Sequence, residues 1–556
     1  MSGAQMVIAC LEQEQIDLIF GFPGGAVLSL YDALYDSSLK HILTRHEQAA
    51  VHAADGYARI SGKPGVVFAT SGPGATNLVT GIATAYMDSV PLILVTGQVA
   101  SNMIGTDAFQ EADITGITLP ITKHNYLIKN VKDIPVVFKE AFYLATTGRK
   151  GPVLIDLPKD VQNDQAEFCY PEEVYIQGYK PTLEGHPGQI IRAANAIKKA
   201  KKPIIYSGGG VVHAAAWDEL RAVAEKGCIP VTTTLTGLGA FPTDHELFLG
   251  MPGMHGTVAA NYALSQADLI IAAGARFDDR VTGRLDCFAR QACVIHIDVD
   301  PAEIGKNVEA QIPIVGDVRK VLEQLLLRME AGDTGAWLEQ VNLWKKQYPL
   351  TFENSGDVIR PQYVIKELYR LTAGEAIVTT DVGQHQMWAA QYLHCKYPRS
   401  FASSGGLGTM GFGFPAALGA QVAAPGRVVL CITGDGSFQM NIQELATASR
   451  YRLPVKIAII NNSYLGMVRQ WQELFYNKRY AETFLEGNPD FVKVAEAYNI
   501  MGLKASRPEE VEPVIRKALE HDGPVLMDFV VASEENVFPM VAPNTPIDEI
   551  IGGGSK

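Results

Sequence analysis

Short runs of Val, Ile and Leu recur along the whole chain, and stretches with helical spacing of apolar positions separate them. The runs do not alternate between apolar and polar residues, which is typical of strands buried on both faces of a parallel sheet. Helices between such strands predict an α/β protein built from doubly wound parallel sheets. The predicted strands are Gly65–Thr70, Pro91–Gly97, Val153–Leu157, Pro203–Ser207, Leu269–Ala273, Cys293–Asp298, Ala376–Thr380, Arg427–Thr433, Val455–Asn461 and Val525–Val531.

Two polar, proline-containing segments, Asp164–Gly188 and Lys345–Pro361, interrupt this pattern. They divide the chain of 556 residues into three blocks of ordinary domain size. We predict domains at residues 1–165, 185–345 and 360–535, followed by a C-terminal tail at 536–556. The last residues of the tail, Gly552–Lys556, are expected to be flexible.

The composition narrows the possible functions. Charged residues make up 19% and hydrophobic residues 47%, so the chain can bury large cores. The net charge of −13 argues against sequence-independent binding of nucleic acid, which needs a basic surface. No apolar run reaches the roughly 18 residues of a membrane span. The N-terminus is expected to form the first helix rather than a targeting signal.

The cysteines predict a reducing compartment. The seven are scattered without a CxxC pair, which predicts buried, reduced thiols and a cytoplasmic protein. They are Cys10, Cys169, Cys228, Cys287, Cys293, Cys395 and Cys431.

Two polar side chains follow neighbouring predicted strands. Asp435 follows the strand that ends at Thr433, and Asn462 follows the next strand, Val455–Asn461. Because parallel strands end at the same edge of a sheet, these side chains are expected to lie close together. A carboxylate and an amide oxygen suit Mg²⁺ that is shared with phosphate oxygens. The helix start after the turn supplies N–H donors for a diphosphate.

The segment between those strands is predicted to form one helix over Phe438–Arg452, with Met440, Leu445 and Ala448 on one face. Taken alone, the preceding GDGS turn favours a simple strand-to-helix connection capped by its aspartate. The second strand-end residue, Asn462, favours the metal site instead. The chain has no Walker A loop, which excludes a P-loop NTPase.

The GDGS turn, followed after one helix and one strand by NN, resembles the signature of thiamine-diphosphate enzymes. Within them the chain is similar, over nearly its whole length, to the acetohydroxyacid synthase (acetolactate synthase) catalytic-subunit family. Eight motifs in the family's order carry this resemblance. They are RHEQAAVHAADGYAR at 45–59, TSGPGATN at 70–77, GTDAFQEAD at 105–113, GMHGT at 253–257, RFDDRVTG at 276–283, GQHQMW at 383–388, SGGLGTMGFG at 404–413 and GMVRQWQ at 466–472.

The resemblance implies that Glu47 contacts the pyrimidine ring of thiamine diphosphate and favours the tautomer that takes up the thiazolium C2 proton. Without the family, Glu47 is interpreted as a carboxylate at a helix start. In this superfamily the pyrimidine-binding and diphosphate-binding blocks of one site come from different subunits, which implies a homodimer or homotetramer. Gly25, Gln110 and Lys159 are expected to act with Glu47.

The same resemblance implies the remaining contacts of thiamine diphosphate. They are Val382, Gly383, Gln384, His385, Gly408, Met410, Gly434, Asp435, Gly436, Ser437, Asn462, Tyr464, Gly466 and Met467. Mg²⁺ is expected on Asp435, Asn462 and the main-chain oxygen of Tyr464. Met410 matches the apolar residue under the bent cofactor, although Met is also a common core residue.

The middle block gives a weaker signal. Glycines follow the strand Pro203–Ser207 and an acid ends the strand Cys293–Asp298, but no complete GxGxxG fingerprint accompanies them. The family implies a bound FAD without a redox role. The alternative is a degenerate nucleotide fold kept for assembly. The expected FAD contacts are Arg149, Gly208, Gly209, Gly210, Thr234, Leu235, Met254, His255, Gly274, Arg276, Asp278, Arg280, Asp298, Asp317, Gly405 and Gly406.

The implied activity is that of a transferase in the biosynthesis of valine, leucine and isoleucine. Pyruvate is decarboxylated, and the hydroxyethyl carbanion is transferred to pyruvate or 2-ketobutyrate, giving 2-acetolactate or 2-aceto-2-hydroxybutyrate. Trp471 is expected to contact the extra methyl group of 2-ketobutyrate, and Arg280 the acceptor carboxylate. Further residues of the expected substrate channel are Ala26, Phe109, Met254, Met467 and Val468.

Three alternatives remain open. Glyoxylate carboligase lacks a glutamate at the position that Glu47 occupies here, and pyruvate oxidase would use its flavin in turnover. A non-catalytic flavoprotein or assembly subunit would not need Glu47, Asp435 and Asn462 together. A small regulatory subunit is a further expected partner, whereas nucleic acid and membranes are not.

Overall fold

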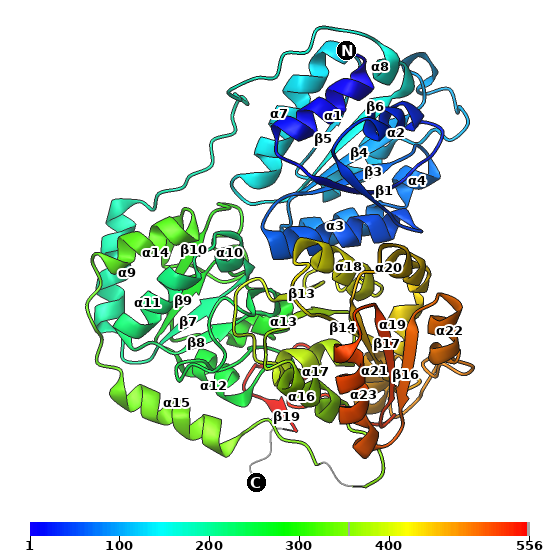
Figure 1. Ribbon diagram of the computed structural model, residues 1–556. Helices are drawn as coiled ribbons and strands as arrows, with labels where there is room; N and C mark the ends of the chain where they lie inside the picture. The colour runs from blue at the N-terminus through cyan, green and yellow to red at the C-terminus, as the bar shows by residue number, and fades with distance from the viewer. Residues whose placement is uncertain (354–355, 553–556) are drawn as a thin grey trace.

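Three parallel sheets, each covered by helices on both faces, make up most of the protein (Figure 1). The computed structural model describes residues 1–353 and 356–552, so residues 553–556 of the tail expected to be flexible lie outside the described part. The prediction of an α/β protein with doubly wound parallel sheets is confirmed. The domain limits drawn from the two polar segments stay a prediction.

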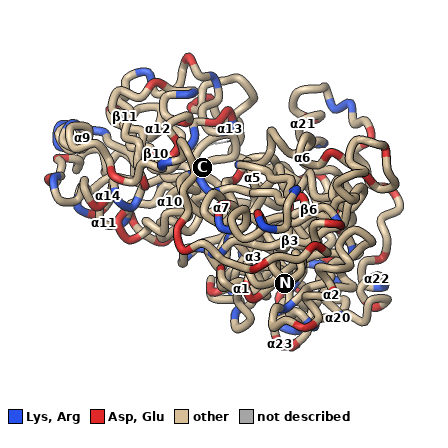
Figure 2. Tube along the Cα trace, turned by 90° about the horizontal axis from the view of Figure 1, so that it is seen from above, with Lys and Arg blue, Asp and Glu red and all other residues tan. Residues whose placement is uncertain are grey.

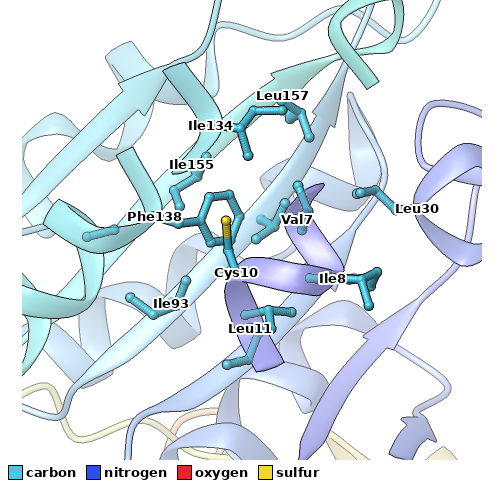
Figure 3. Packing of buried hydrophobic residues seen from close by; sticks show 14 of the residues in the cluster. Val7, Ile8, Cys10, Leu11, Leu30, Ile93, Ile134, Phe138, Ile155 and Leu157 are labelled. Carbon is cyan, nitrogen blue, oxygen red and sulfur yellow. The ribbon is translucent and has the colours of Figure 1, made fainter. Parts of the chain in front are cut away.

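The first sheet has the strand order β2-β1-β3-β4-β6-β5. Its strands are β1 (Leu18–Phe22), β2 (Lys40–Leu43), β3 (Gly65–Ala69), β4 (Leu92–Gln98), β5 (His124–Leu127) and β6 (Pro152–Pro158). Its helices are α1 (Gly3–Gln13), α2 (Leu28–Tyr35), α3 (Glu47–Ser61), α4 (Pro73–Thr76), α5 (Val79–Asp88), α6 (Ile114–Thr118), α7 (Ile134–Thr146) and α8 (Lys159–Asn163). Alternate residues of each strand enter two separate cores, one under α1 and α7 and the other under α3 and α5. In the first core Cys10 packs beside Phe138 (Figure 3).

The middle sheet has the order β11-β10-β9-β7-β8. Its strands are β7 (Pro203–Ser207), β8 (Val231–Thr233), β9 (Leu269–Ala273), β10 (Cys293–Asp298) and β11 (Ile312–Val315). Its helices are α9 (Pro187–Lys199), α10 (Gly209–His213), α11 (Trp217–Gly227), α12 (Val258–Gln266), α13 (Asp279–Thr282), α14 (Val318–Leu326) and α15 (Gly335–Gln347). Because α15 ends at Gln347, the first residues of the second polar segment are helical.

The third sheet has the order β13-β12-β14-β15-β17-β16. Its strands are β12 (Ile377–Thr380), β13 (Phe401–Ser403), β14 (Val429–Gly434), β15 (Lys456–Asn461), β16 (Met501–Ala505) and β17 (Val525–Val530). Its helices are α16 (Pro361–Leu371), α17 (Gln384–Tyr392), α18 (Gly413–Ala423), α19 (Asp435–Gln439), α20 (Leu445–Tyr451), α21 (Gly466–Phe475), α22 (Phe491–Ala497) and α23 (Pro508–Glu520). A short antiparallel pair, β18 (Met540–Val541) and β19 (Ile550–Ile551), follows, and Val541 N donates to Met254 O of the middle domain at 2.7 Å.

Two local predictions were wrong. The single helix expected over Phe438–Arg452 is broken after Gln439, because the Asn441 main chain is not helical (φ −134°, ψ 30°) where its side chain donates to Gly411 O at 2.7 Å. Met440 is consequently 52% exposed, whereas Leu445 and Ala448 are buried. The cysteines are not all buried, since Cys169 and Cys228 are exposed, although all seven are free thiols.

Helices α3 and α18 join the first domain to the third (Figure 1). Their contact is made of small residues: Gly56 lies against the main chain of Ala416, and Gly419 lies against the main chain of Ala53. A Cβ atom at either glycine would collide with that main chain, so glycine permits the close approach. The contact holds α3, and with it Glu47, rigidly against the third domain.

Acidic and basic residues are interspersed along all three domains (Figure 2). Among the described residues, no helix combines the length and the apolar character that crossing a membrane requires.

Candidate active site

A cavity of about 690 Å³ lies between the middle and third domains. The carboxyl ends of β12, β14 and β15 form one side of it, as expected for parallel sheets, which place their ligand sites at that edge. All residues expected to contact thiamine diphosphate line this cavity, with the single exception of Glu47.

Asp435 and Asn462 lie side by side at the floor of the cavity, because Gly434 of β14 is paired with Ile460 of β15. Burial raises the pKa of the Asp435 carboxyl to about 6. Asn488 Nδ2 donates to Asp435 Oδ2 at 2.6 Å, and Tyr464 N donates to Asn462 Oδ1 at 3.1 Å, which fixes the turn after β15. Asn488 lies in a loop without a strand-end signal, so sequence reasoning missed it.

His385 lies buried beside this corner. Burial lowers its pKa to about 3, so the imidazole is neutral, and its Nε2 atom is buried without a hydrogen-bond partner. Gly434 approaches the imidazole so closely that a Cβ atom there would lie 3.0 Å from it. The unpartnered Nε2 atom leaves room for a hydrogen bond to a ligand of this cavity.

The segment Ser404–Gly413 brings Met410 to the cavity wall, and Asp381 holds its end. The Asp381 carboxylate accepts from Gly411 N at 2.7 Å, from Gly413 N at 3.2 Å and from Val382 N at 3.0 Å. Sequence reasoning missed this residue, although Asp381 directly follows a predicted strand, as Asp435 nearly does. The strand-end rule that found Asp435 therefore also applied to Asp381.

The residues expected to contact FAD line the same cavity and a neighbouring one of about 120 Å³. Gly208, Gly210 and Gly274 pack main chain against main chain beside the second cavity, where a Cβ atom on any of them would collide. Asp298 ends β10 at this cavity, and burial raises its pKa to about 6. The glycines and the strand-end acid thus form the cradle that a nucleotide requires.

Six of the candidates line neither cavity and lie in the first domain instead. They are Gly25, Ala26, Glu47, Phe109, Gln110 and Lys159. The turn after β3 brings several of them together: Thr70 Oγ1 accepts from Ala26 N at 3.2 Å, and Gly72 lies against the main chain of Gln110. Glu47 accepts from Asn77 Nδ2 at 3.0 Å beside the same turn. Within this cluster Phe109 is 88% exposed, whereas Glu47 and Ala26 are buried.

Comparison with known proteins identifies the family. Three models of thiamine pyrophosphate enzymes match: the N-terminal TPP binding domain over residues 1–117, the central domain over 190–325 and the C-terminal TPP binding domain over 381–529. The chain is 53% identical to an acetolactate synthase of Mycobacterium bovis, covering 99% of this chain and 91% of the relative. It is 50% identical to acetolactate synthase large subunits of Haemophilus influenzae and of Escherichia coli (isozyme 3), with coverage of 99% of this chain and 98% of each relative.

The chain belongs to the acetolactate synthase large-subunit family of thiamine-diphosphate enzymes. The cavity residues fit the cofactor of this family, because His385 offers an unpartnered buried ring nitrogen and α19 begins directly at the turn. They also fit a hard cation. In the described part of the chain no group of three or more His, Cys, Asp or Glu residues converges, so a cation here would rely on one carboxylate, amide and main-chain oxygens, and phosphate.

The residues that this family would use for the acceptor meet at the mouth of the cavity. The Arg280 guanidinium lies over the Trp471 ring at 5.7 Å, and Arg280 Nη1 lies 3.8 Å from Met254 Sδ. Met467 and Val468 line the wall one turn before Trp471 on α21, which begins at Gly466 as predicted. A cation and a broad apolar ring therefore face the same space.

Proposed function

We propose that this chain is the catalytic subunit of an acetolactate synthase. It converts two molecules of pyruvate to 2-acetolactate and CO₂, and pyruvate with 2-ketobutyrate to 2-aceto-2-hydroxybutyrate. The observation that carries this assignment is the full-length similarity to acetolactate synthases, together with a cavity that combines Asp435 and Asn462 with Arg280 and Trp471. The similarity favours this activity over glyoxylate carboligase and pyruvate oxidase.

The third domain anchors the cofactor in this proposal. Asp435, Asn462 and the main-chain oxygen of Tyr464 would hold Mg²⁺, and the neutral His385 would lie beside the diphosphate with its Nε2 atom free for a hydrogen bond. Thiamine diphosphate, once bound, supplies the nucleophilic carbon that takes up the two-carbon unit of pyruvate. Asp381 keeps the segment that carries Met410 in place beneath it.

Glu47 completes the site from a second copy of the chain. Its carboxyl group is buried in the first domain and lies outside the cavity of its own chain. We place it at the pyrimidine ring of a cofactor bound by the partner subunit, where it holds a proton at the ring nitrogen. Gly25, Gln110 and Lys159, which lie in the same domain, come to that site with Glu47.

Arg280 and Trp471, which line the cavity, recognise the acceptor in this proposal. The Arg280 guanidinium binds the carboxylate of the second 2-keto acid through its paired N–H donors. The Trp471 ring gives the methyl group of 2-ketobutyrate an apolar surface. Ala26 and Phe109 of the partner subunit's first domain would close the channel from the other side.

We further propose one FAD per chain, held by the middle domain. It has no redox role, because the reaction involves no net oxidation or reduction. A small regulatory subunit and a cytoplasmic location complete the proposal. Two relatives are named large subunits, which supports a small partner subunit. The free thiols of the chain support the cytoplasmic location.

The test is direct. Purified protein with pyruvate, thiamine diphosphate and Mg²⁺ should form acetolactate, measured by colour as acetoin after acidification. Asp435→Ala should abolish both the product and Mg²⁺-dependent retention of the cofactor. The absence of product with wild-type protein would contradict the assignment. Bleaching of the flavin at the rate of turnover under anaerobic conditions would identify an oxidase instead.

A further inference from the structure

A single turn of the first domain meets both other domains at the proposed flavin site. Helix α5 ends at Asp88, and Ser89 follows in the left-handed region with φ 60°. The Asp88 side chain is fully buried, although none of the proposed chemistry uses it. A buried carboxylate is costly unless hydrogen bonds or charges compensate it, so its partners indicate its role.

The Asp88 carboxylate holds two consecutive main-chain N–H groups of the third domain. Oδ2 accepts from Gly405 N at 2.9 Å, and Oδ1 accepts from Gly406 N at 2.7 Å. Arg59 of α3 supplies the counter-charge, with Nη2 at 2.8 Å from Asp88 Oδ2 and Nε at 2.5 Å from Asp55. The two bonds to Gly405 and Gly406 join positions more than 300 residues apart in sequence.

The main chain of the same turn holds the middle domain. His213 Nε2, at the end of α10, lies 3.0 Å from Asp88 O. Burial lowers the His213 pKa to about 4, so the neutral ring can donate to this oxygen. Ser89 Oγ accepts from Arg149 Nε at 2.9 Å. The turn therefore contacts the glycine helix α10, Arg149 and the loop at Gly405, which are three separate parts of the proposed flavin site.

The space around Gly406 shows how little these parts can shift. A Cβ atom at Gly406 would lie 2.9 Å from Asp88 Oδ1 and 3.2 Å from Arg276 Nη2, and Arg276 lines both cavities. The loop is thus pressed between the turn and the cavity wall. Loss of the Asp88 bonds would take the side-chain acceptor away from two consecutive main-chain N–H groups and free the loop to move.

We propose that Asp88, with Ser89, is a positioning residue for the flavin site of its own chain. The turn fixes the loop at Gly405–Gly406 relative to α10 and Arg149, so that the three parts form one preorganised site. This inference rests on the flavin assignment of the proposed function and adds to it Asp88 and Ser89, which line the second cavity and act through the parts of the site that they hold.

The experiment compares Asp88→Asn with Asp55→Asn. Both variants remove one buried carboxylate from Arg59, but only the first disturbs the bonds to Gly405 and Gly406. Flavin is removed from the purified proteins, and the dissociation constant for added FAD is measured by quenching of flavin fluorescence. We expect Asp88→Asn to raise this constant at least tenfold, the effect of losing bonds to a charged acceptor, and Asp55→Asn to leave it nearly unchanged.

Equal increases in the two variants would overturn the inference, because they would indicate a general loss of stability. If Asp88→Asn does not fold, Ser89→Ala is tested instead. A rise of about threefold in the dissociation constant for FAD, the effect of one lost hydrogen bond, supports the inference. An unchanged dissociation constant overturns it. Wild-type protein that binds no FAD would overturn the flavin assignment and this inference together. The acetoin assay tests the catalytic assignment separately, since it does not measure flavin affinity.

Discussion

Buried carboxylates near strand ends recur in this protein, and their neighbours decide what each contributes. Asp381 accepts three main-chain N–H groups and serves to hold a loop. Asp435 has one side-chain donor and remains open to the cavity. Asp156 accepts from Thr96 Oγ1 at 2.7 Å and from Gln98 Nε2 at 2.9 Å, and Gln98 in turn donates to Ala112 O of the loop that carries Gln110.

Asp156 should make the stability of the protein depend on pH. Burial raises its pKa from 3.8 to about 7, so the folded state keeps a proton that the unfolded state releases. Asp156→Asn mimics the protonated form and does not titrate. The free energy of unfolding of the wild type, compared with that of this variant, should therefore fall as the pH rises from about 4 to about 7 and level off above that. Melting temperatures of both proteins at pH 5, 6, 7 and 8 measure the difference. A constant difference would show that Asp156 does not titrate in this range.

Glu47→Gln tests the proposed proton transfer. Turnover should fall by roughly 10²–10⁴, the range for a lost acid–base group. Affinity for thiamine diphosphate should change much less, because Asp435 and the diphosphate contacts remain. The measurement is exchange of the cofactor's C2 proton for deuterium, followed by NMR after rapid quenching. Wild-type exchange in the variant would remove Glu47 from this role.

Trp471→Leu tests acceptor choice. The preference for 2-ketobutyrate over pyruvate should fall about tenfold, the low end of what one methylene contributes in an apolar pocket. Turnover of pyruvate alone should survive, since Asp435 and Asn462 are unchanged. Both products are quantified from one mixture of the two acceptors. The control is Tyr476→Leu just after α21, which is 63% exposed and outside the cavity lining and should leave the ratio unchanged.

At the scale of elements, α3 has two tasks. It begins at Glu47, and its middle packs against α18 through Gly56 and Gly419. Its far end carries Arg59, which supports Asp88 and the loop at Gly405. One rigid helix therefore carries a residue proposed for the partner's cofactor at one end and a support of its own chain's site at the other.

Gly419→Ala should damage this packing. The added Cβ atom would meet the main chain of Ala53, which cannot rotate away as a side chain can. We expect a loss of about 1–3 kcal/mol, the usual effect of overpacking, seen as a lower melting temperature. Gly426→Ala is the matched control, because no atom lies within 4 Å of its Cβ position, and it should change stability by less than about 0.5 kcal/mol. Equal effects of both substitutions would contradict the close-packing argument.

At the scale of the whole molecule, the candidates form two half-sites. One lies in the cavity of the middle and third domains, and the other is the cluster around Glu47 in the first domain. In the proposed dimer, each cavity meets the first domain of the other copy. Symmetry then produces two complete sites from two identical chains.

This arrangement predicts complementation between inactive variants. Glu47→Gln and Asp435→Ala chains with different tags are produced together, and the mixed dimer is isolated with both tags. One of its two sites combines an intact Glu47 with an intact Asp435, so it should regain about half of wild-type turnover. Each variant alone should stay nearly inactive. A mixed dimer as inactive as its parents would place Glu47 and Asp435 in one chain's site.

Much of the fold and one corner of the site follow from local sequence. Parallel strands joined by right-handed crossovers must end at one edge, so the positions of Asp435 and Asn462 after neighbouring strands were enough to bring them together. The apolar runs identified most strands for the same reason, since a strand buried on both faces needs an unbroken apolar run. The break in the helix expected over Phe438–Arg452 could not be predicted from the local sequence. At the break the Asn441 side chain is hydrogen-bonded to Gly411, which belongs to a distant segment.

The sequence by itself determined the class of fold, the neighbouring positions of Asp435 and Asn462 and, through family motifs, the candidates for cofactor and acceptor. The tertiary structure alone decided which of them share a cavity: it assembled the middle and third domains around one space and left Glu47, Gln110 and Phe109 outside it. It also revealed Asp88, whose partners Gly405 and Gly406 lie 317 and 318 positions away. The physical reason is that strand order and helix periodicity act over neighbouring residues, whereas a hydrogen bond between domains depends on how separately folded units pack.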